Sequence, residues 1–132
     1  MALNVPDVGE NKALEHLTNK TAPENLILRL FKNNITPADS DTAATYTEST
    51  FPGYAAITLT GASWGAAAAG VITYGSQQTF TCSGVAVESV YGYYITQATS
   101  GVLMWSERDA SAPFVIANSG DAVKITPTIG AN

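Results

Sequence analysis

The apolar positions near the start of the chain follow the period of a helix. Over residues 11–19, Leu14 and Leu17 stand three positions apart, and most of their neighbours are charged or amide side chains. Gly9 precedes this stretch and Pro23 follows it, and both residue types are typical of helix boundaries. The pattern predicts a short amphipathic helix. Its apolar stripe needs a partner surface, because a helix of about three turns is marginal on its own.

After Pro23 the apolar period changes to two, the period of a strand. In residues 26–31, leucine occupies every second position, and isoleucine, arginine and phenylalanine occupy the alternate ones. This predicts a strand that is apolar on both faces. The same alternation between Gly, Pro, Asn and Ser turns predicts further strands at residues 55–60, 71–74, 78–83, 87–95, 102–105, 114–116 and 123–125.

The number and spacing of these strands define the expected fold class. About eight short strands separated by turn residues are typical of an all-β sandwich. We therefore expect a mainly β fold, an antiparallel β-sandwich of the jelly-roll or immunoglobulin-like type with a short N-terminal α-helix. A chain of 132 residues fits one domain. Residues 1–24 are predicted to form an N-terminal arm and the helix, and residues 25–132 a single β-sandwich domain.

Residues 89–109 are the most aromatic part of the chain, with three of the six tyrosines and one of the two tryptophans. A Thr-Ser-Gly turn at residues 99–101 separates two apolar stretches. Residues 90–95 and 102–105 are therefore predicted to pair as a hairpin.

The aromatic side chains of this hairpin have two possible roles. Tyr91 and Tyr93 are expected on one face of a strand that continues to Ile95, where they would pack across strands. The alternative is a platform for sugars or nucleotide bases made by Tyr91, Tyr93, Tyr94 and Trp105. Packing is favoured, because the ring of Asp, Asn and Arg that accompanies carbohydrate platforms is missing from this stretch.

Residues 33–50 are rich in Thr, Ala, Asp and Ser and contain few large apolar side chains, which predicts a long surface loop. Loops of this length are uncommon in compact domains and are often functional. Asp39 and Asp41 form an Asp-Ser-Asp triplet, but the glycine and glutamate that a calcium loop needs at fixed offsets are missing. We expect a polar loop rather than a metal site.

The charge balance argues against several classes of partner. The formal net charge is −5 and the six Lys and Arg residues are scattered singly, so no basic surface is expected for a run of phosphates. The apolar run that begins at Gly65 is much shorter than the roughly 20 residues that cross a bilayer. The first residues also lack the basic and apolar regions of a signal peptide. We expect no nucleic-acid partner, no membrane association and no secretion.

Few side chains are available for catalysis. His16, the only histidine, lies on the predicted helix and is expected to be solvated or to cap it. Cys82, the only cysteine, alternates with Phe80 and is expected to be a small buried core residue. We predict no catalytic, cofactor-binding or metal-binding residues and no cofactor, and we expect the protein not to be an enzyme.

Three segments of the chain, taken together, carry a resemblance to known proteins. They are residues 28–41, 51–64 and 90–132, and in this order they extend over nearly the whole chain. Their most characteristic pieces are Tyr-Ala-Ala-Ile-Thr-Leu at 54–59, Val-Tyr-Gly-Tyr-Tyr at 90–94 and Trp-Ser-Glu at 105–107. The chain resembles small structural proteins encoded among the head and tail genes of tailed bacteriophages. This resemblance points to a component of the virion rather than to a reaction.

Within that family, the resemblance implies a capsid decoration or cement protein. Such a protein would bind the major capsid protein on the outer shell as a homotrimer, and would be made in the host bacterial cytoplasm. The alternatives are a tail, neck or head-fibre component and, from another class, a carbohydrate-binding β-sandwich module. The apolar N-terminal segment and the polar loop are the expected contacts with the capsid or another partner, through Leu3, Val5, Leu14, Leu17, Asp39 and Asp41.

Overall fold

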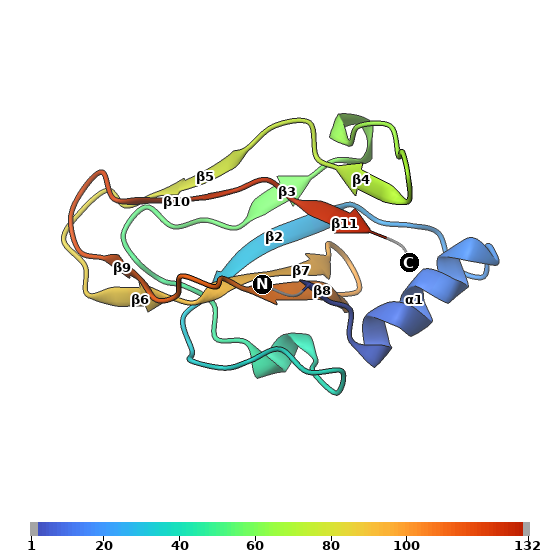
Figure 1. Ribbon diagram of the computed structural model, residues 1–132, viewed down its shortest axis with the longest axis horizontal. Helices are drawn as coiled ribbons and strands as arrows, with labels where there is room; N and C mark the ends of the chain where they lie inside the picture. The colour runs from blue at the N-terminus through green and yellow to red at the C-terminus, as the bar shows by residue number, and fades with distance from the viewer. Residues whose placement is uncertain (1–2, 131–132) are drawn as a thin grey trace.

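The computed structural model describes residues 3–130, which form antiparallel sheets and one α-helix (Figure 1). The expected mainly β fold with a single short N-terminal helix is confirmed. Residues 1–2 and 131–132, the outer ends of the predicted arm and domain, lie outside the described residues. The largest sheet has five strands in the order β1-β8-β7-β2-β3. These strands are β1 (Leu3–Asn4), β8 (Leu103–Arg108), β7 (Gly92–Gln97), β2 (Leu26–Phe31) and β3 (Ile57–Leu59).

Three further sheets have two strands each and are also antiparallel. They pair β10 (Ala122–Ile125) with β5 (Gln78–Thr81), β11 (Thr128–Gly130) with β4 (Val71–Thr73), and β6 (Glu88–Val90) with β9 (Phe114–Ile116). Figure 1 shows the β5–β10 ladder above the five-stranded sheet and the β6–β9 ladder at one end of the molecule. The predicted strands at residues 71–74, 78–83, 114–116 and 123–125 correspond to β4, β5, β9 and β10. β1 and β11 were not predicted, and β1 is only two residues long.

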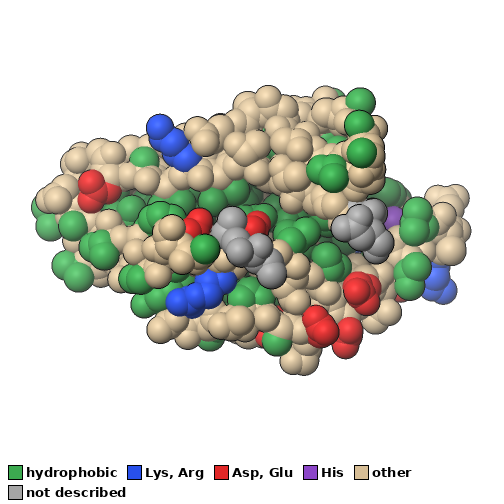
Figure 2. Space-filling model, in the orientation of Figure 1, with side chains coloured by type: hydrophobic (Ala, Val, Ile, Leu, Met, Phe, Trp, Pro, Cys, Tyr) green, Lys and Arg blue, Asp and Glu red, His purple; other side chains and the backbone are tan. Residues whose placement is uncertain are grey.

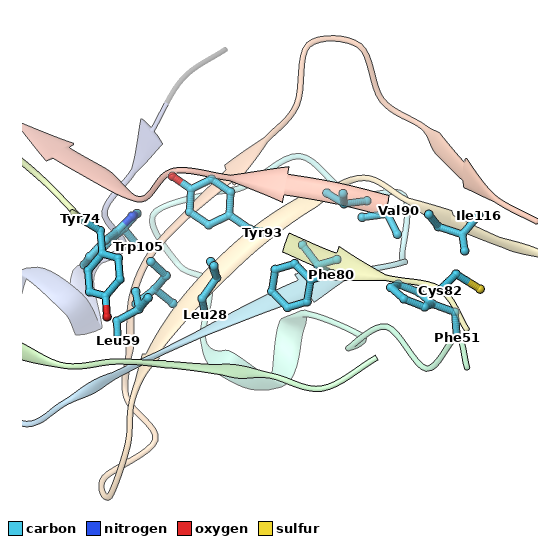
Figure 3. Packing of buried hydrophobic residues seen from close by; sticks show 13 residues of the cluster. Leu28, Phe51, Leu59, Tyr74, Phe80, Cys82, Val90, Tyr93, Trp105 and Ile116 are labelled. Atoms are coloured by element: carbon cyan, nitrogen blue, oxygen red, sulfur yellow. The ribbon is translucent and has the colours of Figure 1, made fainter. Parts of the chain in front are cut away.

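The main core lies between the five-stranded sheet and the β5–β10 ladder (Figure 3). Leu28, Leu30 and Ile95 come from the sheet and are fully buried. Phe80 of β5 and Val123 of β10 face each other in the ladder register and belong to the same cluster. Burial of one such side chain contributes about 1.5–3 kcal/mol. The alternating leucines of β2 therefore stabilise the packing of the ladder on the sheet.

The opposite face of the sheet is covered by the loop that was predicted to lie on the surface. Its Tyr46, which follows the short 3-10 helix η1 (Ala43–Thr45), is buried and stacks on Tyr94 with ring centroids 4.9 Å apart. Tyr46 also packs edge-on against Phe31 at 4.9 Å. Most residues of this loop are at least partly exposed, as predicted for a surface loop, but one aromatic residue among many small polar ones anchors it on the sheet.

The predicted aromatic hairpin is confirmed. β7 pairs with β8 through Tyr93 opposite Glu107 and Ile95 opposite Trp105, with a register shift between Ile95 and Thr96. The chain turns between the two strands at residues 98–102, where the Gly101 amide donates to the Gln97 carbonyl at 3.1 Å.

The predicted continuous strand over residues 87–95 is instead broken at Tyr91. Val90 ends β6, and Gly92 begins β7. The main core contains Val90 as well as Tyr93, whereas Tyr91 packs on the other face of the sheet, under the Arg108 guanidinium at 5.0 Å. Tyr91 and Tyr93 therefore do not share a face. The backbone of Tyr91 bonds to Phe31 and to residue 109, which resets the alternation at this point.

The helix α1 (Asp7–Leu17) begins four residues before the predicted start and ends two before the predicted end. Pro6 occupies the N-cap in an extended conformation, and its carbonyl oxygen accepts from the amides of Gly9 and Glu10. Gly9, the predicted boundary, lies inside the helix. It packs so close to β8 that a Cβ there would collide with the carbonyl oxygen of Met104. Close packing on β8, rather than helix termination, explains this glycine.

The turn between β7 and β8 is held by a carboxylate from the segment before β2. Glu24 accepts hydrogen bonds from the amides of Thr99, at 2.6 Å, and Ser100, at 2.9 Å. These backbone donors lower the pKa of Glu24 below its ordinary value of 4.5. A carboxyl group with a depressed folded-state pKa stabilises the fold above its unfolded pKa, and this stabilisation is lost as the pH falls through the folded-state value.

We expect Glu24→Gln to lower the urea midpoint near pH 7 and to have a smaller effect at about pH 3, because the wild-type carboxyl loses its advantage as the pH falls toward its lowered folded-state pKa. Urea titrations followed by tryptophan fluorescence at several pH values measure the difference. Asp39→Asn is the matched control, because Asp39 is exposed and its carboxylate makes no hydrogen bond within residues 3–130. A Glu24→Gln effect that is the same at both pH values would contradict the assignment.

Candidate functional site

His16 is held in a small hydrogen-bond network at the end of α1. Its Nδ1 lies 3.0 Å from the Thr21 carbonyl oxygen, and its Nε2 lies 2.5 Å from Nε2 of Gln97. The Gln97 Oε1 accepts from the Ser100 hydroxyl at 2.6 Å, which directs the amide nitrogen toward the histidine. In this arrangement His16 donates through Nδ1 and accepts through Nε2. The histidine fastens the helix end to β7, and both of its ring nitrogens are engaged in this contact.

Cys82 lies in the main core, as expected. Its side chain is 1% exposed, and its Sγ donates to the Gly84 carbonyl oxygen at 3.1 Å. Figure 3 shows the thiol among Phe51, Phe80 and Ile116. A buried thiol in apolar surroundings behaves as a small hydrophobic residue.

The aromatic residues of the hairpin lie inside the molecule. The exposed fractions of Tyr93, Tyr94 and Trp105 are 6%, 4% and 3%. Their ring faces therefore pack against core residues, and burial raises the pKa of Tyr94 to about 12. The packing interpretation is confirmed for these three residues, since a sugar could not stack on rings that are covered.

The two loop acids have different environments. Asp39 is exposed. Asp41 is buried, and its Oδ2 accepts from the Tyr46 hydroxyl at 2.8 Å and from the Ala38 amide at 2.9 Å. The Tyr46 oxygen also lies 2.7 Å from the Ser106 hydroxyl on β8. The Asp41 carboxylate therefore ties the loop to the sheet and offers no free surface to a partner. Among the described residues, no three His, Cys, Asp or Glu side chains come together as metal ligands.

The four predicted apolar contacts of the N-terminal segment separate into two pairs. Leu3 lies in β1 opposite Glu107, and Leu3 and Val5 are partly buried against the main core. Leu14 and Leu17 point away from the fold, with exposed fractions of 59% and 82%. We call Leu14 and Leu17 the helix patch. Of the four predicted contacts, only Leu14 and Leu17 keep a large exposed apolar surface for a partner.

A second apolar surface, which the sequence did not reveal, lies on the β6–β9 ladder and on the residues before β6. Val85 and Val87 have exposed fractions of 85% and 98%, and Phe114 and Val115 have 36% and 64%. The ladder pairs Ser89 with Val115, so Val87 and Val115 lie diagonally on one face, whereas Phe114 pairs with Val90 and lies on the other face. We call these four residues the tip patch. The sequence placed Val87 on a predicted strand over residues 87–95 and did not show that this end is exposed, since an exposed apolar edge has the same alternation as a buried one.

The two patches lie at opposite ends of the long axis of the molecule. Figure 2 shows hydrophobic side chains over β6 and β9 at one end and over α1 at the other. Single exposed apolar residues are common on soluble proteins, but gathered ones mark surfaces that bind other molecules. No helix within residues 3–130 has the length and apolar character to cross a membrane.

Comparison with known proteins adds no constraint on this site. No protein-family model matches the sequence, and no curated protein matches it. The function is therefore argued from the surfaces of the chain itself.

Proposed function

We propose that this chain is a non-enzymatic structural protein that binds other protein subunits through the tip patch and the helix patch. The observation that carries the proposal is the placement of two exposed apolar patches at opposite ends of one small molecule. One patch would suit binding to a single partner. Two separated patches suit a protein that connects two neighbouring subunits, because both patches become buried only when both neighbours are present.

The specific role that we propose is a capsid decoration or cement protein of a tailed bacteriophage. In this role the chain binds the major capsid protein on the outer shell as a homotrimer and is located on the virion. The resemblance over residues 28–41, 51–64 and 90–132 supports the phage assignment, and the two patches support the cement role. We also propose that the five-stranded sheet and the ladders above it are the two layers of a β-sandwich.

The proposal is tested on purified particles of the phage that encodes the chain. We expect cryo-electron microscopy to show the chain in many copies over junctions between major capsid subunits, with the tip patch and the helix patch both covered. A few copies at a single vertex would replace the cement role with a neck, tail or head-fibre role. Absence of the chain from the particles would overturn the structural proposal altogether.

A binding measurement with variants tests the patches themselves. Shells of the major capsid protein are mixed with the purified full chain, and the bound fraction is measured by co-sedimentation. We expect Val87→Ser and Leu17→Ser each to weaken binding about tenfold, the loss expected from removing one well-buried interface contact of more than 1 kcal/mol. Val71→Ser is the matched control, because Val71 is 42% exposed and belongs to neither patch. Equal binding by all three variants would show that the patches are not the contact surfaces.

A further inference from the structure

A pocket opens between the five-stranded sheet and the layer above it, close to the tip patch. Its volume is about 320 Å³, at the lower end of the roughly 300–1,000 Å³ found for ligand sites. Residues of β6, β7, β8, β9 and β10 line it, and Phe114 belongs both to this pocket and to the tip patch. Figure 2 shows the hollow between the two layers, with hydrophobic side chains in its depth.

Two carboxylates line this pocket, and each is oriented by one internal hydrogen bond. Glu107 Oε2 accepts from the Tyr93 hydroxyl at 2.7 Å, and Asp109 Oδ1 accepts from the Ser111 amide at 2.7 Å. Burial and the Glu107 carboxylate raise the pKa of Tyr93, which keeps its hydroxyl protonated as a donor. Within residues 3–130, the second oxygen of each carboxylate has no protein donor, and neither residue forms an ion pair. Each carboxylate therefore has a fixed orientation and a second oxygen that can accept a hydrogen bond from a ligand.

The rest of the lining is mostly apolar. Val90 and Val123 are buried core residues with surfaces on the pocket, and the Phe114 ring stands at its side. The one basic residue of the lining is Lys124, which is exposed and makes no ion pair within the described chain. A pocket with apolar walls and two oriented carboxylates matches a group that has an apolar stem and a cationic end.

We infer that this pocket takes a lysine or arginine side chain from the protein subunit that covers the tip patch. The inference rests on the proposed function for the identity of its occupant. Two observations favour a side chain of that subunit. Phe114 lies on the pocket face of the β6–β9 ladder and its neighbour Val115 on the opposite face, so a subunit that wraps around the end of this ladder has the pocket within reach. The chain has a net charge of −5, and a basic partner side chain complements the two carboxylates.

The pocket itself is tested with a probe that needs no partner. The full chain is labelled with ¹⁵N and titrated with n-butylammonium chloride, with 1-butanol as the neutral control, and amide shifts are followed by NMR. We expect butylammonium to move the amides of residues 92–93, 107–109 and 123–125, and 1-butanol to move them much less. Equal shifts with both probes would overturn the cationic assignment, and no shift with either would overturn the pocket.

Three variants separate the charges that line the pocket. We expect Glu107→Gln and Asp109→Asn each to weaken butylammonium binding about tenfold, the low end of what one charge-assisted hydrogen bond contributes. Both substitutions keep an acceptor for the internal donor, and unchanged thermal unfolding confirms that the fold is retained. Lys124→Gln is the matched control of opposite sign, because it removes a competing cation and is expected to strengthen binding. Weaker binding by Lys124→Gln would contradict the inference.

The same variants in the shell-binding assay distinguish failure of this inference from failure of the proposed function. We expect Glu107→Gln to weaken shell binding, and the loss to diminish at high salt, since screening weakens ionic contacts. If Val87→Ser weakens shell binding while Glu107→Gln and Asp109→Asn do not, the proposed function stands and the pocket occupant is wrong. If the probe binds the pocket but the chain does not bind shells, the pocket stands, and its occupant does not come from the capsid.

Discussion

Replacing Gly92 by alanine is expected to lower the free energy of unfolding by about 3 kcal/mol or more, the upper range of overpacking effects. Gly92 lies at the start of β7, opposite Arg108 in the β7–β8 ladder. A Cβ at this position would collide with the Glu107 carbonyl oxygen and would lie 2.8 Å from Cε1 of the Phe31 ring. The carbonyl belongs to the ladder and cannot rotate away, so the strands must separate. Urea titration followed by circular dichroism measures the loss.

The matched control for this substitution is Gly61→Ala. Gly61 has no atom within 4 Å of the position of an added Cβ, and its φ is not positive. We expect a change within about 0.5 kcal/mol, the usual range of surface substitutions. A Gly92→Ala variant as stable as the Gly61→Ala variant would show that β7 and β8 do not approach as closely as described.

Replacing Phe31 by alanine is expected to cost about 3–5 kcal/mol, the range for large-to-small substitutions of buried phenylalanine. Phe31 is fully buried and packs between the sheet and Tyr46 of the loop over residues 33–50. Its loss leaves a cavity under the loop and removes an aromatic contact that contributes about 0.5–1.5 kcal/mol beyond area burial. The free energy of unfolding comes from urea titration, and limited proteolysis reports on the loop.

Val115→Ala is the control for the Phe31 substitution, because Val115 is 64% exposed in the tip patch. We expect its free energy of unfolding to remain within about 0.5 kcal/mol of the wild type. Proteolysis should cut the loop faster in Phe31→Ala than in the wild type. If stability falls while the loop remains protected, the loop is held by the Asp41, Tyr46 and Ser106 hydrogen bonds rather than by aromatic packing.

The elements that were predicted best are those whose signals lie within a few neighbouring residues of the sequence. The β7–β8 hairpin combines alternating apolar residues with a Thr-Ser-Gly turn, and both signals act over neighbouring residues. The early start of α1 was missed, because Gly9 is explained by its contact with β8 and not by its neighbours in sequence. The break at Tyr91 was missed for the same reason, since a backbone bond to Phe31 determines where the alternation resets.

The candidate contact surfaces were predicted only in part. The spacing of Leu14 and Leu17 indicated an apolar stripe in need of a partner, and both side chains are exposed. The same reasoning could not show that Asp41 is buried, because burial there depends on Tyr46 reaching Ser106 on a distant strand. Nor could it separate Val87, which is exposed, from Val90, which is in the core. Alternation identifies the two faces of a strand but not which face another segment will cover.

The pairing of the last strands has a consequence for how the chain folds during synthesis. β10 pairs with β5 and β11 pairs with β4, so the strands that close over the main core come from the end of the chain and the middle. Until residues 122–130 have left the ribosome, Phe80 and Ile72 have no ladder partner to cover them. Non-local pairing of this kind slows folding, because the loop must close before its contacts form. The nascent chain therefore reaches its protected state only after residues 122–130 have emerged and paired, and until then the apolar side of the sheet is open to aggregation.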